Sequence, residues 1–234
     1  MSKEEKGNIP GIRTFLSFIK DVVYPENAIC RACGRIADSG CLCSACREEL
    51  TFSGSAFSWE WKDVDGVRVY SMRPHDGAAR TLVIRLKHQA EACLAGELAD
   101  LILPVPAFLN FPSDTVVTWV TMPESRRRDR FIDHGKLLAE AVAERLGLQS
   151  GQLLLRADSS SGTQASLGRA QRLRNLENVF SAACPIDFPV LIVDDVLTTG
   201  TTISRCAGAL RRAGALDITG LTITRSVYRQ PSLF

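Results

Sequence analysis

The sequence lacks three features that would indicate a class of protein directly: a large excess of one charge, a long apolar run and many aromatic residues. Its 28 basic and 26 acidic residues leave a net charge of +2, which is too small to indicate nucleic acid binding by itself. Only 7% of the residues are aromatic, and those such as Trp61, Phe131 and Tyr228 are scattered. Platforms on which nucleic acid bases stack are therefore poorly indicated.

No segment is long and apolar enough to predict a membrane span. The most apolar early stretch, Phe15 to Val23, contains Lys20 and Asp21 and is far shorter than the roughly 20 residues that cross a bilayer. The first residues, M-S-K-E-E-K, mix charges, and no small-residue cleavage site follows, so a secretory signal is not expected. We therefore predict a cytoplasmic protein, with an amphipathic helix from Arg13 to Val23 that packs on the domain after it.

Two common phosphate-binding motifs are also missing. The sequence has neither the Gly-Lys-[Ser/Thr] ending of a Walker A loop nor the G-x-G-x-x-G of a dinucleotide site. The phosphate-binding pattern lies instead in Val190 to Thr202, which reads V-L-I-V-D-D-V-L-T-T-G-T-T. Its four leading apolar residues, three of them β-branched, predict a buried parallel strand, and the apolar spacing from Ile203 onward predicts a helix.

A hydroxyl-rich loop lies between this strand and this helix. Main-chain N–H groups and threonine hydroxyls at the beginning of a helix suit a phosphate group. Asp194 and Asp195, expected where the strand stops, can reach vicinal hydroxyls or a hydrated Mg²⁺ beside that phosphate. The stretch therefore predicts a pocket for a ribose phosphate, and the alternative is an ordinary turn that the acids only cap and solvate. The loop consists of Thr198, Thr199, Gly200, Thr201 and Thr202.

Five of the eight cysteines lie between Cys30 and Cys46. The pairs Cys30-x2-Cys33 and Cys43-x2-Cys46 predict two turns whose thiolates form a tetrahedral site, for which Zn²⁺ is the usual metal. Four thiolates leave no open position, so we expect a structural metal. Cys41 is a fifth thiol. A ligand set with Cys41 in place of Cys43 stays open, as does a group of buried or redox-active cysteines without metal.

Beyond the cysteines the sequence alternates between strand and helix patterns. This alternation predicts an α/β fold with a mainly parallel sheet, whose ligands bind at the carboxyl ends of the strands. Val67, Val69 and Ser71 alternate with Arg68 and Tyr70, which predicts a half-buried strand with the latter two on its solvated face. Further strands are expected at 116–120, 153–155 and 218–224, and helices at 78–87, 94–102 and 136–146. We divide the chain into an N-terminal helix and loose terminus at 1–24, a zinc-ribbon-like module at 25–55 and an α/β domain at 56–234.

Basic residues gather in two further segments. Arg126 to Arg130 follows the strand expected at 116–120, and Arg169 to Arg174 follows the flexible S-S-S-G-T run. A mobile basic segment could close over a polyphosphate and exclude water, and a solvated helix face is the alternative. No residue is indicated as a general base, since His88 and His134 are isolated and such histidines are more often surface or packing residues. The candidate contacts to diphosphate or to DNA phosphates are Lys87, Arg126, Arg130 and Arg172.

Several of these motifs together resemble the ComF family, from about Phe15 to Arg225. They are the cysteine pairs, R-T-L-V-I-R-L-K at 80–87, T-Q-x-x-L-x-x-x-x-R-x-x-N-x-x-x-x-F at 163–180 and V-D-D-V-L-T-T-G-T-T at 193–202. The resemblance implies a zinc ribbon joined to a type I phosphoribosyltransferase-like domain and a link to competence, the uptake of DNA during natural transformation. In that superfamily the two acids bind the ribose 2′ and 3′ hydroxyls of phosphoribosyl diphosphate and the Thr/Gly loop holds its 5′-phosphate. The resemblance thus implies a catalytic role for Asp194 and Asp195.

The chain departs from the family pattern in two places. Val120-Thr121-Met122-Pro123 stands where the family has a Val-Pro-Val-Pro-like turn, and R-F-I-D-H-G at 130–135 replaces R-G-F-[ND]-x-A. In phosphoribosyltransferases the loop after that strand cradles diphosphate, so these departures concern turnover more than ribose-phosphate binding. The main prediction is a protein that binds phosphoribosyl diphosphate with Mg²⁺, or a ribose 5-phosphate nucleotide, and transfers phosphoribosyl to an unidentified acceptor. The alternative is a non-catalytic component of DNA uptake that binds single-stranded DNA and DNA-uptake proteins. The oligomeric state stays open.

Overall fold

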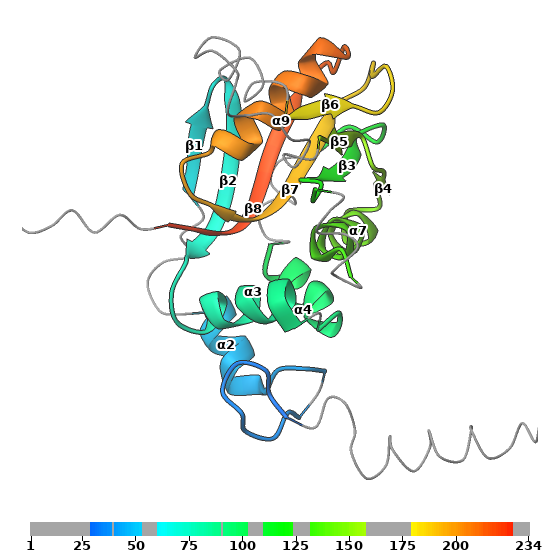
Figure 1. Ribbon diagram of the computed structural model, residues 1–234. Helices are drawn as coiled ribbons and strands as arrows, with labels where there is room; N and C mark the ends of the chain where they lie inside the picture. The colour runs from blue at the N-terminus through cyan, green and yellow to red at the C-terminus, as the bar shows by residue number, and fades with distance from the viewer. Residues whose placement is uncertain are drawn as a thin grey trace, which may run out of the picture.

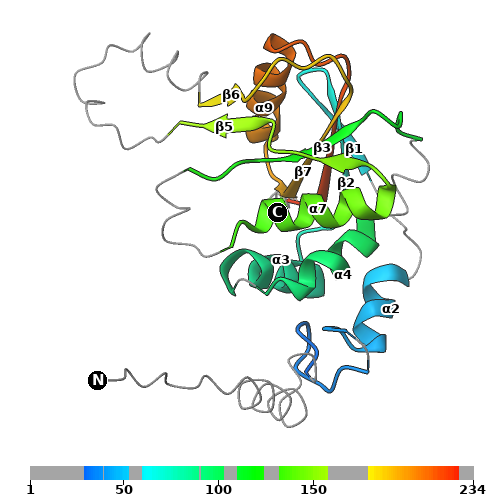
Figure 2. The same ribbon diagram turned by 90° about the vertical axis from the view of Figure 1, so that its right-hand side faces the viewer.

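A six-stranded sheet in the order β1-β2-β8-β7-β3-β4 forms the centre of the molecule (Figures 1 and 2). The computed structural model describes residues 29–38, 40–52, 60–89, 91–102, 110–123, 132–157 and 179–226. Neighbouring strands pair in parallel except β1, which pairs antiparallel with β2. The predicted α/β fold with a mainly parallel sheet is therefore confirmed. The strands are β1 (Glu60–Val64), β2 (Val67–Pro74), β3 (Val116–Trp119), β4 (Gln149–Ser150), β7 (Val190–Leu197) and β8 (Ile218–Arg225).

Helices cover both faces of this sheet. One face packs against α3 (Gly77–Gln89), α4 (Cys93–Ile102) and α7 (His134–Leu146), and the other packs against α9 (Thr201–Arg212) (Figure 1). Successive side chains of a strand point to opposite faces, so the apolar residues of β7 enter both layers of core. This is why the apolar run that begins β7 is continuous and does not alternate with polar residues.

β2 differs from the half-buried strand expected at Val67 to Ser71. Tyr70 was expected on a solvated face, but it is only 4% exposed, and Val69 and Met72 are buried as well. The reason is that β2 lies inside the sheet, between β1 and β8, and helices cover the face on which Tyr70 lies. Only Arg68 keeps the expected exposure.

The short strand expected at Leu153 to Leu155 lies outside the main sheet. It forms β5 (Leu154–Arg156), which pairs antiparallel with β6 (Phe180–Ala182) in a separate two-stranded sheet. The N–H of Leu153 donates to the side-chain hydroxyl of Thr118 at 3.2 Å and to the main-chain oxygen of Gly151 at 3.1 Å, so this segment contacts β3 through a side chain and does not pair with it. Figure 2 shows β5 and β6 on the side of α9, above β3 and α7.

Two elements near the cysteines were not predicted. α2 (Ser44–Phe52) begins inside the second cysteine pair, and β1 precedes β2. The turn between β1 and β2 is Asp65-Gly66, with φ of 51° and 74°, the left-handed geometry of a tight hairpin. Arg211 of α9 donates to both main-chain oxygens of this turn at 2.9 Å, so the hairpin is fixed to the helix.

The helix expected from Arg13 to Val23 lies outside the described residues, and so does the basic segment at 169–174. Among the helices that the structure describes, none has the length and apolar character needed to cross a membrane.

Candidate functional site

The chain leaves the neighbouring strands β7 and β3 in opposite directions. After β7 it passes through α9 to β8, and after β3 it passes through α7 to β4, on the other side. In open parallel sheets, ligands bind outside the carboxyl ends of the strands at such a switch point. The strand order alone therefore locates the candidate site at the ends of β7 and β3, beside the beginnings of α9 and α7.

The two acids of β7 lie on opposite faces of the sheet. β7 continues to Leu197, so both acids lie within the strand. The sequence pattern had predicted that the strand ends at these acids. The pairing with β8 keeps this segment extended through Asp194 and on to Leu197. Because successive residues alternate, Asp195 shares the face of Val193, toward α3 and α7, and Asp194 shares the face of Ile192, toward α9.

Asp195 is held by side chains from two helices. Lys87 Nζ of α3 lies 2.8 Å from Asp195 Oδ2, and His134 Nε2 of α7 lies 3.5 Å from the same oxygen. Lys87 also donates a hydrogen bond to Asp195 Oδ1 at 3.1 Å. Burial raises the pKa of this carboxyl, but His134 and Lys87 outweigh burial and lower the pKa to about 2. Asp195 is therefore a fixed carboxylate that ties β7 to the helices on one face.

Asp194 has a different environment on the other face, where it is half-buried. Its Oδ1 accepts a hydrogen bond from the main-chain N–H of Asp195 at 2.9 Å. Burial, and next the charge of Asp195, raise the pKa of Asp194 to about 7, although Lys87 and Arg156 act in the opposite direction. A ligand that donates hydrogen bonds from hydroxyl groups, or a cation, would stabilise the ionised form of Asp194.

The loop after β7 is shaped by Gly200. Its φ is 91°, and a Cβ on this residue would lie 2.8 Å from both methyl groups of Val64, so glycine fits here without strain. The hydroxyls of Thr199 and Thr201 lie 2.8 Å apart, and the N–H of Thr201 donates to Thr199 Oγ1 at 3.3 Å. The threonines at 198, 199, 201 and 202 are exposed, and the first turn of α9 carries no acid. The beginning of α9 therefore offers N–H groups and hydroxyls to an anion.

Two residues near the acids were missed in the sequence. His75 Nδ1 lies 2.8 Å from Thr224 Oγ1, and that hydroxyl donates to the main-chain oxygen of Asp195 at 3.3 Å. Arg156 of β5 lies over the ring of Phe180, with 5.2 Å from Cζ to the ring centre. Arg156 directly follows the strand predicted at 153–155, and His75 follows β2, which continues to Pro74, beyond its predicted end at Ser71. The rule that ligands bind at carboxyl ends of strands was thus the signal that could have found them.

The other predicted contacts have mixed outcomes. Lys87 reaches the site, where Asp195 binds it, and His134 begins α7 beside the same carboxylate. His88 is exposed on α3. Arg126, Arg130 and Arg172 lie outside the described residues.

The four paired cysteines come together at a distance from this site. Their sulfur atoms lie within 4.8 Å of one another, and Cys33 Sγ is 3.7 Å from Cys43 Sγ. Four thiolates arranged around Zn²⁺ at about 2.3 Å lie about 3.8 Å apart, so the cluster fits a tetrahedral metal ion. A side-chain hydrogen bond from Arg35 lowers the pKa of Cys33 to about 6, which favours the thiolate that binds metal. The members are Cys30, Cys33, Cys43 and Cys46.

Local structure explains why these sulfurs converge. The N–H of Gly34 donates to the oxygen of Cys30 at 2.8 Å, and Gly34 has a φ of 77°, which turns the first pair back on itself. The second pair leads into α2, so that Cys46 lies in its first turn. Cys41 lies outside the cluster, so the structure does not support the ligand set in which Cys41 replaces Cys43.

The curated proteins similar to this chain carry names from DNA use and competence. Competence protein F of Haemophilus influenzae is 24% identical over 214 residues, 82% of this chain and 88% of the relative. DNA utilization protein YhgH of Salmonella typhimurium is 30% identical over 158 residues, 64% of this chain and 69% of the relative. The chain belongs to the ComF family. Competence protein ComFC of Streptococcus pneumoniae is 30% identical over 98 residues, 42% of this chain and 44% of the relative.

Solved structures similar to this ComF chain are phosphoribosyltransferases. The orotate phosphoribosyltransferase from Aeropyrum pernix is 21% identical with a TM-score of 0.36, covering 71% of this chain and 74% of that one. An adenine phosphoribosyltransferase is 15% identical with a TM-score of 0.38, covering 78% of this chain and 90% of that one. No family model matches the chain.

Proposed function

We propose that the carboxyl end of β7 binds the ribose 5-phosphate part of phosphoribosyl diphosphate or of a nucleotide. The observation that carries this proposal is the position of Asp194 directly before the Gly200 loop, at the switch point between β7 and β3. A carboxylate and an anion-binding helix terminus at one strand end match a sugar that carries both hydroxyls and a phosphate.

The two acids take different roles in this proposal. Asp194 contacts the ribose hydroxyls, since it is half-buried and its pKa of about 7 shows a carboxylate that lacks full stabilisation. Asp195 is a positioning residue, because Lys87 and His134 already bind it on the opposite face. The 5′-phosphate accepts hydrogen bonds from the loop N–H groups and from the hydroxyls of the threonines at 198–202.

A divalent cation fits this arrangement. Carboxylate oxygens and phosphates are the ligands that Mg²⁺ prefers, and Asp194 would hold the ion through its water molecules. When bound, Mg²⁺ neutralises charge that develops on the departing diphosphate.

The reaction that suits this pocket is transfer of a phosphoribosyl group to a nitrogen nucleophile. Such a transfer passes through an oxocarbenium-like state, so the protein mainly needs to fix the sugar and neutralise diphosphate. Asp194 and the loop would fix the sugar. The side chain of Lys87 is 37% exposed beside Asp195, so it could turn from Asp195 to diphosphate.

Calorimetry with phosphoribosyl diphosphate and Mg²⁺ tests the pocket. We expect binding by the unmodified protein and a loss of at least tenfold in affinity for Asp194→Asn, which keeps the shape of the side chain and removes its charge. Asp187→Asn is the matched control, because Asp187 is exposed before the opposite end of β7. Absence of heat with the unmodified protein, or equal binding by both variants, would refute the pocket. Release of diphosphate in a screen of nitrogen acceptors then tests transfer.

The names of the relatives favour a second function, binding of single-stranded DNA in DNA uptake. In this case the arginines at 126–130 and 169–174 would contact DNA phosphates, and affinity would fall steeply as the salt concentration rises. Fluorescence anisotropy with labelled single strands tests this function. If charge reversal at Arg126 to Arg128 leaves affinity unchanged, these contacts are wrong. A protein that binds DNA equally well with Asp194→Asn would separate the two functions.

For the cysteine cluster we propose a structural Zn²⁺, because four thiolates complete a tetrahedral ion and leave no position for substrate. The purified protein is expected to carry one zinc per chain. A content well below this value would overturn the assignment. The division into a terminal segment at 1–24, a zinc module at 25–55 and an α/β domain at 56–234 remains a proposal.

A further inference from the structure

Cys41 is a buried thiol close to the four-cysteine cluster, and the proposed metal site does not use it. It is 1% exposed and lies between the two cysteine pairs in the sequence, yet the four-sulfur cluster excludes it. Cys93, the first residue of α4, is also without a role in the proposed function, and it is exposed. The two residues come from different parts of the chain, so only the fold brings them together.

The segment that carries Cys41 packs on the first turns of α4. The N–H of Cys41 donates to Glu97 Oε1 at 3.3 Å, and Glu97 is one helical turn after Cys93. Because the side chains of a helix point toward its N-terminus, the bond to Glu97 places Cys41 beside the first turn of α4, where Cys93 lies, and Cys93 acts on the Cys41 thiol. Gly40, with a φ of 61°, allows this approach, because a Cβ there would collide with the carboxylate of Glu97. The two thiols therefore both lie at the contact between the cysteine-rich segment and the first turns of α4.

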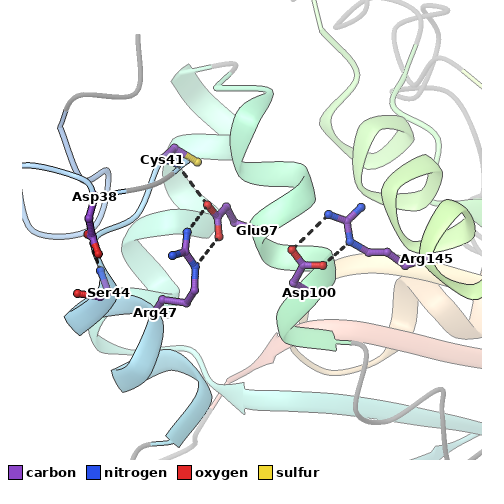
Figure 3. A network of polar contacts seen from close by, with 7 residues as sticks. All are labelled: Asp38, Cys41, Ser44, Arg47, Glu97, Asp100 and Arg145. Atoms are coloured by element: carbon purple, nitrogen blue, oxygen red, sulfur yellow. Dashed lines mark hydrogen bonds and ion pairs between the residues drawn. The ribbon is translucent and has the colours of Figure 1, made fainter. Parts of the chain in front are cut away.

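A charged pair keeps this contact in place. Arg47 of α2 donates to both oxygens of Glu97, at 2.8 Å and 3.2 Å (Figure 3). Figure 3 also shows that Asp100, on the same helix α4, pairs with Arg145 of α7. α4 is thus held on one side by the cysteine-rich segment and on the other by the helix that begins at His134.

We infer that Cys41 and Cys93 form a disulfide when the protein meets a hydroperoxide. The exposed Cys93 sulfur attacks the peroxide oxygen, which gives a sulfenic acid and releases an alcohol, or water when the oxidant is hydrogen peroxide. The Cys41 sulfur then attacks the Cys93 sulfur, the S–O bond breaks, and water leaves with the thiol proton. Each disulfide therefore consumes one peroxide, and both thiols are oxidised.

The disulfide would fix the cysteine-rich segment covalently to α4. In the reduced protein, the Arg47–Glu97 pair stabilises this segment on the domain, and the proposed metal ion would stabilise it further. In the oxidised protein, the segment would stay attached after the metal is removed, because the crosslink spans two distant parts of the sequence. The disulfide would thus stabilise the same contact that the proposed metal ion stabilises.

Peptide mapping of the zinc-loaded full chain tests this inference. The protein is treated with an equimolar amount of hydrogen peroxide, alkylated, digested without reductant and analysed by mass spectrometry. We expect one linked pair of peptides that contains Cys41 and Cys93, lighter by two hydrogens than the separate peptides, which disappears on reduction. Cys93→Ser should abolish it, and Cys184→Ser, at another exposed cysteine, should leave it unchanged.

Two results would overturn the inference. One is a sulfinic acid on Cys93 while Cys41 remains a free thiol that is alkylated after denaturation. The other is a linked pair that joins Cys41 or Cys93 to a member of the metal cluster. In Cys41→Ser, where the second step cannot occur, the sulfenic acid on Cys93 should accumulate and react with dimedone more than in the unmodified protein. A yield of dimedone adduct that does not rise would also count against the second step.

Discussion

Replacement of Asp194 by asparagine is expected to stabilise the protein at neutral and alkaline pH. Asparagine keeps the oxygen that accepts the N–H of Asp195 at 2.9 Å and removes the charge. The folded protein raises the pKa of Asp194 from its ordinary value of 3.8 to about 7. The native state therefore favours the protonated carboxyl more than the unfolded state does. The stability from this preference is fully present below pH 3.8 and is lost as the pH rises through 7.

The size of the effect follows from this shift in pKa. A shift of one pH unit corresponds to about 1.4 kcal/mol, so a rise from 3.8 to about 7 gives an upper bound of about 4 kcal/mol. Because the carboxyl is half-buried and keeps part of its contact with water, we expect about 2 kcal/mol. Residues that serve binding often lower the stability of the folded protein, and the cost expected for Asp194 agrees with its proposed role.

Urea denaturation between pH 4 and pH 9, with zinc present and without phosphoribosyl diphosphate, measures this difference. The free energy of unfolding of Asp194→Asn should match that of the unmodified protein at the acidic end and exceed it increasingly toward pH 8. Asp187→Asn, at an exposed carboxyl, should show no such divergence. A difference between Asp194→Asn and the unmodified protein that is constant with pH would show that the pKa of Asp194 is not raised, and the reasoning would fail.

Three further outcomes are expected. Gly200→Ala should lower the free energy of unfolding by about 2 kcal/mol in urea denaturation, because φ is 91° and the new methyl group would collide with Val64. Gly208→Ala, inside α9, is the control. Its methyl group would make only an ordinary contact at 3.5 Å, so this variant should not be less stable. Lys87→Met should cost about 1 to 2 kcal/mol at pH 7 by removing a partner of the buried Asp195 carboxylate. Because Asp195 has a pKa lowered from 3.8 to about 2, the stability from its partners is present above pH 3.8 and is lost as the pH falls toward 2. The deficit of Lys87→Met should shrink over that range, and a deficit that persists at pH 2 would contradict the ion pair. Cys46→Ser, or a strong chelator, should remove the metal and make residues 29–52 susceptible to proteolysis. Metal analysis and limited digestion measure the two effects. Full resistance to digestion without metal would contradict a structural role.

Local patterns account for the elements that were predicted correctly. The apolar run that begins β7 and the helical spacing after Ile203 depend on neighbouring residues, and both elements occur where the sequence placed them. The cysteine pairs are also local, since each spacing of two residues matches one tight turn. The hairpin turn at Asp65-Gly66 was equally local and was missed, although this dipeptide is a strong turn pattern.

Other errors arose where packing decided the outcome. β7 was expected to end at its first acid, because charged residues are rarely buried, but hydrogen bonds to β8 extend it to Leu197. Tyr70 was expected to be exposed, and it is buried because β2 lies inside the sheet under helices. Leu154 to Arg156 has the composition of a strand, and only the position of Phe180 to Ala182 beside it decides which sheet it joins.

The sequence by itself determined the parallel α/β fold, the hydroxyl-rich loop around Gly200 and the four thiols, because each depends on residues close together in the chain. Only the tertiary structure decided which partners the acids have. Asp195 meets Lys87, a residue 108 positions away, because α3 packs on β8, the strand beside β7. The same long-range packing places Asp194 on the opposite face, as the candidate ribose contact, and brings the segment of Cys41 to the helix that begins at Cys93. No local pattern encodes these contacts, since they depend on which faces of distant elements bury their apolar surface together.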